Sequence, residues 1–384
     1  MIRVRNLTIL LAFVFFLAAP LHAQLGKTII IPAGSEMDHE LAEINAADPA
    51  QKLKLLDAFS AAHPDADAQI LINEQYVNYY IGIKQYDKAF QYGDKLFALD
   101  PDNFSNAVNM VRAANEAGDT NRLFAAGEKD SGILQRFKAQ AAPAGTSPEA
   151  WKGQQEQKLE SIKDNQAYIE QSLMSVAFQQ KDAATKAATL VRVGNFFPDS
   201  PNSVQALSNA ALLYQQAQNR PKMIETANSV LAKDPENLGM LLLLADDYGE
   251  KGENLDKADE YAKKAAAACD TAKKPENVSD DDWKKQINLQ KGLALSALGQ
   301  VDLQKKANTT AVEHLTKAAP FLKSNNTMYA RNQYRLGFAY LNLKKSAEAK
   351  QAFTEAASVD SPYKGPAQDK LKGIAAKPGA RKPA

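Results

Sequence analysis

The sequence has few of the residue types that build metal sites or disulfide frameworks. Its 384 residues include one cysteine, Cys269, and four histidines, His22, His39, His63 and His314. A single cysteine excludes an intramolecular disulfide, and its place in an alanine-rich run is typical of buried helical packing. The histidines stand far apart and show no metal-ligand spacing. We therefore predict no metal and no cofactor.

Neither sign of charge is in excess. Lys and Arg number 46, Asp and Glu number 45, and the formal net charge is +1. Proteins that bind nucleic acid or a membrane surface by electrostatics need a basic field, which this composition does not supply. With 45% hydrophobic and 24% charged residues, the chain has the composition of a folded protein. We predict no nucleic-acid partner.

Catalytic constellations are missing as well. His39 and Glu40 begin a segment that looks like a zinc-protease helix, but Glu43 stands where the second histidine must be. The sequence has no Gly-rich phosphate loop, no GxSxG nucleophile elbow and no paired-cysteine motif. We predict that the chain is not an enzyme.

The N-terminal segment has the pattern of a secretory signal. Arg3 and Arg5 precede a nearly unbroken apolar run over residues 7–20, and a small residue, Ala23, offers a cleavage site. The run is shorter than the roughly 20 residues of a stable membrane span. No cysteine stands directly after the run, so we expect no lipid anchor. The segment predicts export to the periplasm or the cell exterior with cleavage after Ala23; an uncleaved signal anchor is the alternative.

A spacing that recurs along the chain is the main evidence for the fold. A small residue is followed after three residues by an aromatic, the aromatic after nine by a second small or apolar residue, and that residue after twelve by proline. These positions are Val77, Tyr80, Ala89 and Pro101, and again Ala211, Tyr214, Met223 and Pro235. Gly337, Tyr340 and Ala349 repeat the first two intervals. Residues abundant throughout, such as Ala, Lys, Leu, Gln and Glu, favour helix.

Each position in this spacing has a physical role in a pair of helices. Residues three apart share one helix face, so the small residue admits a neighbouring helix and the aromatic fills the space beside it. Gly118, Gly252 and Gly299 follow the aromatic position and are expected to supply left-handed caps between the two helices. Proline then ends the second helix. The pattern predicts helix–turn–helix repeats.

Two stretches resemble the tetratricopeptide repeat family closely. One is Tyr334-Arg335-Leu336-Gly337-Phe338-Ala339-Tyr340 with Ala347-Glu348-Ala349 and Phe353; the other runs over residues 86–103. The resemblance implies an all-α, right-handed superhelical solenoid whose first helices form a concave face. It also implies a protein or peptide partner rather than a substrate.

The repeats divide the chain into segments. From Leu295 to Ala311 the usual interval of nine is sixteen residues, so we expect longer helices there. The predicted segments are a signal peptide at 1–23, N-terminal repeats at 24–137, an irregular linker at 138–164, central repeats at 165–270, a loop at 271–284, C-terminal repeats with a capping helix at 285–376, and a disordered basic tail at 377–384.

Two sets of residues are candidates for partner binding. The resemblance associates the positions of Asn78 and Asn109 with the grip on a peptide's terminal carboxylate, and Arg112 is the cation beside them. Glu74, however, stands where that pattern has a lysine and would repel a carboxylate, so we do not expect a carboxylate clamp.

The second set is Arg331, Tyr334 and Arg335 in the last repeat. Arg and Tyr are favoured at interfaces, and we hypothesise that these residues contact an acidic or C-terminal peptide segment. An ordinary solvated helix face is the alternative.

Together these features predict an exported, non-catalytic scaffold that binds peptide or helical segments in the groove of a solenoid. The alternative is a helical component of cell-envelope machinery, either an outer-membrane assembly factor or a cell-wall enzyme subunit. Residues 197–201 are similar to repeat ends in such proteins. The identity of the partner stays open.

Overall fold

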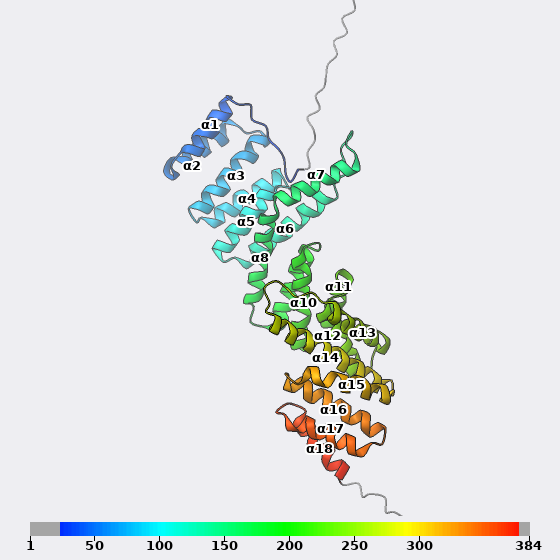
Figure 1. The fold of residues 1–384 in the computed structure, drawn as a ribbon. Coiled ribbons are helices and arrows are strands. Elements are labelled where there is room, and N and C mark those ends of the chain that lie inside the picture. The colour runs from blue at the N-terminus through cyan, green and yellow to red at the C-terminus, as the bar shows by residue number, and fades with distance from the viewer. Residues whose placement is uncertain (1–23, 376–384) are drawn as a thin grey trace, which may run out of the picture. The chain divides into compact units, whose positions relative to one another are not determined.

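The computed structural model describes residues 24–375 and consists there of eighteen α-helices without a β-strand (Figure 1). The all-α fold of paired repeat helices is therefore confirmed. The predicted signal peptide at 1–23 and the basic tail at 377–384 lie outside the described residues. The chain forms two compact units, one ending at Gln179 and the other beginning at Gln180.

The first unit contains the helices α1 to α8. Their bounds are α1 (Glu36–Ala46), α2 (Pro49–Ala62), α3 (Ala66–Gly82), α4 (Tyr86–Leu99), α5 (Phe104–Ala117), α6 (Thr120–Lys138), α7 (Pro148–Ser161) and α8 (Lys163–Gln179). Side chains of Ser, Asp or Asn cap the N-termini of most of these helices, as in Asp65 accepting from the Ala68 amide at 2.9 Å.

The segment predicted as an irregular linker contains α7. Ser147 caps this helix and Pro148 occupies its first turn, where a missing amide proton costs nothing. Trp151 of α7 packs against Phe137 and donates its indole N–H to the Gln140 carbonyl at 2.9 Å. Within residues 138–164, only residues 139–147 and Ile162 lack helix.

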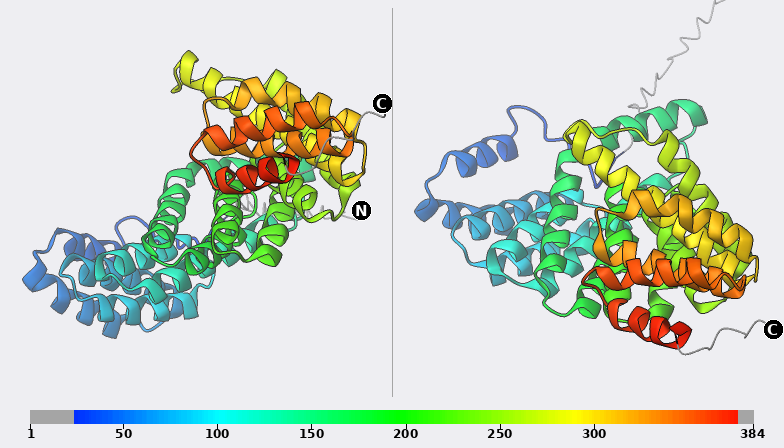
Figure 2. Two further views of the ribbon diagram at one scale, coloured as in Figure 1. Left: turned by 90° about the horizontal axis from the view of Figure 1, so that it is seen from below. Right: turned by 60° about the horizontal axis from the view of Figure 1, so that its bottom comes forward.

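The second unit contains α9 to α18, which follow one another as stacked helices (Figure 2). Their bounds are α9 (Ala183–Phe196), α10 (Pro201–Gln216), α11 (Arg220–Lys233), α12 (Leu238–Lys251), α13 (Leu255–Thr271), α14 (Asp280–Gln304), α15 (Asn308–Leu322), α16 (Asn326–Asn342), α17 (Ser346–Ser358) and α18 (Lys364–Ala375). The expected lengthening is confirmed by α14, which has 25 residues. A helix, α18, is also present where a capping helix was predicted.

The three glycines predicted as left-handed helix caps differ in backbone conformation. Gly118 and Gly252 have φ of 69° and 68°, so their prediction as left-handed caps is confirmed. The prediction for Gly299 is wrong because this residue lies inside α14, and Lys306 (φ 62°) makes the left-handed turn instead. A Cβ at Gly299 would lie 2.4 Å from Leu315 Cγ, so glycine is needed there for the close approach of α15.

A buried polar contact recurs between neighbouring repeats. Asn106 Nδ2 donates to the Gly93 carbonyl at 2.8 Å, Ser203 Oγ to the Gly194 carbonyl at 2.7 Å, and Asn332 Nδ2 to the Leu315 carbonyl at 2.9 Å. In each case a first helix is tied to the second helix of the preceding repeat. Since an unpaired polar group would be costly in this interior, the contact fixes the register between repeats.

Residues 25–27 form a clasp on the first unit. Leu25 packs beside Phe137 and Trp151, and the Lys27 amide donates to Asp100 Oδ2 at 2.9 Å. Between them, Gly26 has φ of 103°, which favours glycine. A Cβ at this position would lie 2.9 Å from Asp100 Oδ2 and 3.1 Å from Asn103 Cα.

We expect Gly26→Ala to destabilise the first unit by about 1–3 kcal/mol because it adds backbone strain and a clash with Asp100. Urea unfolding followed by Trp151 fluorescence in a Trp283→Phe background measures the effect. Gly34→Ala is the matched control, since Gly34 also has a positive φ of 77° but no atom within 4 Å of the new Cβ. Equal losses in the two variants would show that the clasp contributes nothing.

Candidate functional site

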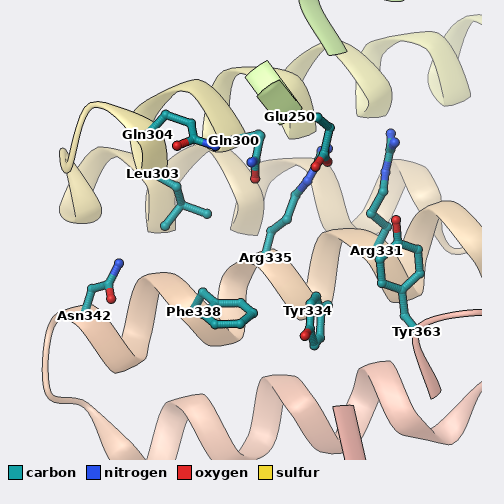
Figure 3. Close-up of a pocket in the computed structure, with 10 residues that line it drawn as sticks. All are labelled: Glu250, Gln300, Leu303, Gln304, Arg331, Tyr334, Arg335, Phe338, Asn342 and Tyr363. Atoms are coloured by element: carbon teal, nitrogen blue, oxygen red, sulfur yellow. The ribbon is translucent and has the colours of Figure 1, made fainter. Parts of the chain in front are cut away.

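A groove of about 300 Å³ opens on the second unit between α12, α14 and α16 (Figure 3). The side chains that line it come from these three helices, and Tyr363 from the turn before α18 closes one end. They are Glu250, Gln300, Leu303, Gln304, Arg331, Tyr334, Arg335, Phe338, Asn342 and Tyr363.

Helical spacing explains how one face of α16 supplies half of the lining. Residues 331, 334, 335, 338 and 342 fall on neighbouring turns of the same face. The opposite face of the helix is held by Gly337, where a Cβ would lie 2.6 Å from a ring atom of Phe353. Close packing of α17 behind α16 thus leaves the polar and aromatic face toward the groove.

The two arginines of α16 meet one carboxylate of α12. Asp246 accepts from Arg331 Nη1 at 2.8 Å through Oδ2 and from Arg335 Nη2 at 3.0 Å through Oδ1. Glu250, one turn further along α12, also pairs with Arg335 Nη2. Arg335 Nη1 donates in addition to the carbonyl and hydroxyl oxygens of Ser296, at 3.2 and 3.0 Å.

The ion pairs decide the charge states of this network. Burial alone would raise the pKa of Asp246, but the charges of Arg335 and Arg331 outweigh burial and hold that pKa below its ordinary value. Burial disfavours the charged form of Arg335, yet Asp246 and Glu250 raise its pKa above the ordinary value. Both groups are therefore ionised at neutral pH.

The aromatic side chains of the groove pack against one another, Tyr334 edge to face with Phe338 and tilted against Tyr363. Tyr334 and Phe338 have ring centroids 5.0 Å apart, and Tyr334 and Tyr363 are 5.7 Å apart. Burial raises the pKa of Tyr334 and of Tyr363, so both phenols stay neutral and can donate or accept a hydrogen bond. Phe353 lies behind Tyr334 at 5.6 Å and fixes the wall from the other side.

The structure thus brings Arg331, Tyr334 and Arg335 together in one groove. It buries Arg335, whose side chain is 5% exposed, and it occupies both guanidinium groups with Asp246. Sequence reasoning missed Asp246 and Glu250 as site residues. The interval of four residues between Asp246 and Glu250 indicates that both lie on one face of a helix. Nothing in the sequence pairs this face with Arg331 and Arg335, some 85 positions away.

The other candidate set lies on the first unit. Arg112 Nη2 is 3.1 Å from Asn109 Oδ1 and 3.5 Å from Asn78 Oδ1, so these three predicted residues of α3 and α5 are neighbours on an exposed surface. Burial raises the pKa of Glu74, which occupies the position expected for a lysine. The only cation of this set, Arg112, is thus already bonded to the amide oxygens of Asn78 and Asn109.

Residues 24–375 offer neither a cluster of metal ligands nor a membrane span. No group of three or more His, Cys, Asp or Glu side chains in this range could hold a metal ion. None of its helices is both long enough and apolar enough to cross a membrane. Cys269 is buried, and burial raises the pKa of its thiol to about 11.

Comparison with known families matches residues 330–363 to the tetratricopeptide repeat. These residues cover α16, α17 and the turn that carries Tyr363, and so include most of the groove's α16 wall. No curated protein matches the sequence.

Several solved structures resemble the chain at low sequence identity. A thermophilic tetratricopeptide repeat protein of Thermus thermophilus is 16% identical, with 54% of this chain and 98% of that chain covered and a TM-score of 0.34. Yeast Tom70 is 14% identical, with 92% and 67% covered and a TM-score of 0.35. NprR in complex with its cognate peptide NprX is 11% identical, with 88% and 81% covered and a TM-score of 0.30. At these scores the likenesses identify neither a partner nor a site.

Proposed function

We propose that this chain is an exported, non-catalytic scaffold that binds a peptide or helical segment of a partner protein in the groove between α12, α14 and α16. The observation that carries the proposal is the groove itself. Its walls are fixed by the Asp246 ion pairs and by the packing of Phe353, so little ordering cost remains for binding.

The lining suits a polypeptide. Gln304 presents a side-chain amide with donors and an acceptor, which match the N–H and C=O groups of a peptide backbone. Gln300 and Asn342 each donate one N–H within the protein, to the Gly249 carbonyl and to Asn308 Oδ1 respectively, and keep an acceptor oxygen and a second N–H. Tyr334 and Phe338 offer aromatic surface for an apolar side chain, the combination that recurs at protein interfaces. The repeat at residues 330–363 is of a type that serves protein binding.

Site-specific crosslinking tests the proposal. A photo-crosslinking amino acid in place of Gln304, inside the groove, should capture a partner segment in the native extract. The same replacement of Gln368, exposed on α18 and outside the groove, should not. Equal capture at the two positions, or capture at Gln368 alone, would contradict the proposed groove.

Mass spectrometry of the crosslinked product also decides the kind of partner. Recovery of an outer-membrane assembly factor or a cell-wall enzyme would favour a role in envelope machinery. Recovery of a soluble client protein would favour an independent scaffold.

Export is supported by the positive, apolar and small-residue pattern of residues 1–23. We expect the secreted or periplasmic form to begin at Gln24. N-terminal sequencing of the protein from fractionated cells measures this directly. A protein that stays in the cytoplasm with residues 1–23 intact would overturn the proposed localisation but leave the groove unaffected.

A further inference from the structure

The groove is lined by cations whose charge is already compensated. Arg331 and Arg335 both pair with Asp246, and Arg335 is in addition enclosed by Ser296 and Glu250. Because two carboxylates face two guanidinium groups, the groove has no net charge of either sign, and its preference depends on which charged group is most accessible. An acidic segment would have to displace an internal ion pair to reach Arg335, and Arg331, whose Nη1 already pairs with Asp246, is only 15% exposed.

The charged group that faces solvent most is an acid. The Glu250 side chain is 44% exposed, compared with 15% for Arg331 and 5% for Arg335. Its Oε1 pairs with Arg335, and no described residue pairs with its Oε2. Glu250 therefore stands at the rim of the groove with one carboxylate oxygen available to an incoming donor (Figure 3).

The rest of the lining is neutral but would favour the stem of a long cationic side chain. Leu303, Tyr334 and Phe338 give an apolar wall, along which the methylene groups of a lysine or arginine can lie. The amides of Gln300 and Gln304 lie on α14 beside Glu250 and can bind the backbone on either side of such a residue.

We propose that the groove selects a partner segment with a lysine or arginine, whose cationic head binds the Glu250 carboxylate. This inference rests on the proposed function, since it names the chemistry of the segment that the groove takes. It replaces the hypothesis of an acidic or C-terminal segment bound by Arg331 and Arg335.

Selection from a phage-displayed random peptide library on the purified full chain tests the proposal. Selected peptides that crosslink at position 304 are expected to be rich in Lys and Arg and poor in Asp and Glu. Glu250→Gln should weaken their binding roughly fivefold, the effect of one partly exposed ion pair. Glu236→Gln, which neutralises an exposed acid outside the groove, should leave binding unchanged.

A measurement on the unaltered protein covers the case in which Glu250→Gln does not fold. Raising NaCl from about 50 mM to about 500 mM should weaken a selected basic peptide several-fold, because salt screens a solvent-exposed pair. A salt-independent affinity would overturn the proposal.

The outcomes separate this inference from the function on which it rests. Peptides that crosslink at position 304 but carry no basic residue, or carry acids instead, overturn the inference and leave the groove as a binding site. If no selected peptide crosslinks at position 304, the proposed function fails together with the inference.

Discussion

Replacing Arg335 by alanine is expected to destabilise the second unit by about 3 kcal/mol, near the lower limit for breaking a buried ion pair. The guanidinium group joins three helices because it bonds to Asp246 and Glu250 of α12 and to Ser296 of α14 from its own place on α16. Without it, a buried acceptor at Ser296 and a cavity remain. The loss of stability is smaller than for a buried carboxylate left without any partner, because Arg331 still pairs with Asp246.

Urea unfolding followed by circular dichroism measures this loss, and Trp283 fluorescence identifies the transition of the second unit. Arg331→Ala is the matched control, since it removes an arginine of the same helix with one ion pair to Asp246, and should cost about 1 kcal/mol. A double-mutant cycle with Asp246→Asn should show coupling to Arg335. Equal losses for the two arginines would contradict the assigned role of Arg335.

The network also shows why the sequence predicted the place of the site but not its charge. An interval of four residues puts Arg331 and Arg335 on one face of α16, and this follows from helix geometry alone. Whether that face meets solvent or a carboxylate depends on α12, whose Asp246 is 85 and 89 residues away along the chain. No local pattern encodes such a distant pairing.

The turns show a similar limit. The spacing predicted where helices pair, but the inserted residues between Leu295 and Ala311 extend α14 past Gly299 to Gln304. The turn then falls on Lys306, and the same kind of left-handed turn is made by Lys84, Gln218 and Lys344 elsewhere. Because tertiary packing of the flanking helices can impose positive φ on a lysine or glutamine, glycine is an incomplete guide to these turns.

A buried carboxyl group in the first unit leads to the second prediction. Asp130 of α6 is fully buried, and the amide of Gln166 is the polar group that interacts with its carboxyl group, although without good hydrogen-bond geometry. Gly127, one turn earlier, lies against Leu173 of α8, which places Asp130 near Glu170 one turn before Leu173. Burial, and then repulsion from Glu170, outweigh the lowering effect of Gln166 and raise the pKa of Asp130 from 3.8 to about 8.

This shift predicts that the first unit becomes less stable as the pH rises. The folded protein holds the Asp130 proton up to about pH 8, whereas the unfolded chain releases it near 3.8, so stability falls across that interval and is level above it. Asp130→Asn keeps the shape of the neutral acid and removes the titration. We therefore expect the variant to be about 2–4 kcal/mol more stable than the unaltered protein at pH 9, and close to it near pH 4.

Urea midpoints at about pH 4, 7 and 9, followed by Trp151 fluorescence in a Trp283→Phe background, test this prediction in the first unit. Asp67→Asn, at an exposed position of α3, controls for the general effect of removing one negative charge and should show no comparable gain at pH 9. Parallel loss of stability with pH in the unaltered protein and in Asp130→Asn would show that Asp130 does not titrate in this range. A gain in stability at pH 9 for Asp130→Asn, without a gain for Asp67→Asn, would assign the alkaline loss of stability to the contact between α6 and α8. The proton on Asp130 then allows this contact to bury Asp130 beside Glu170.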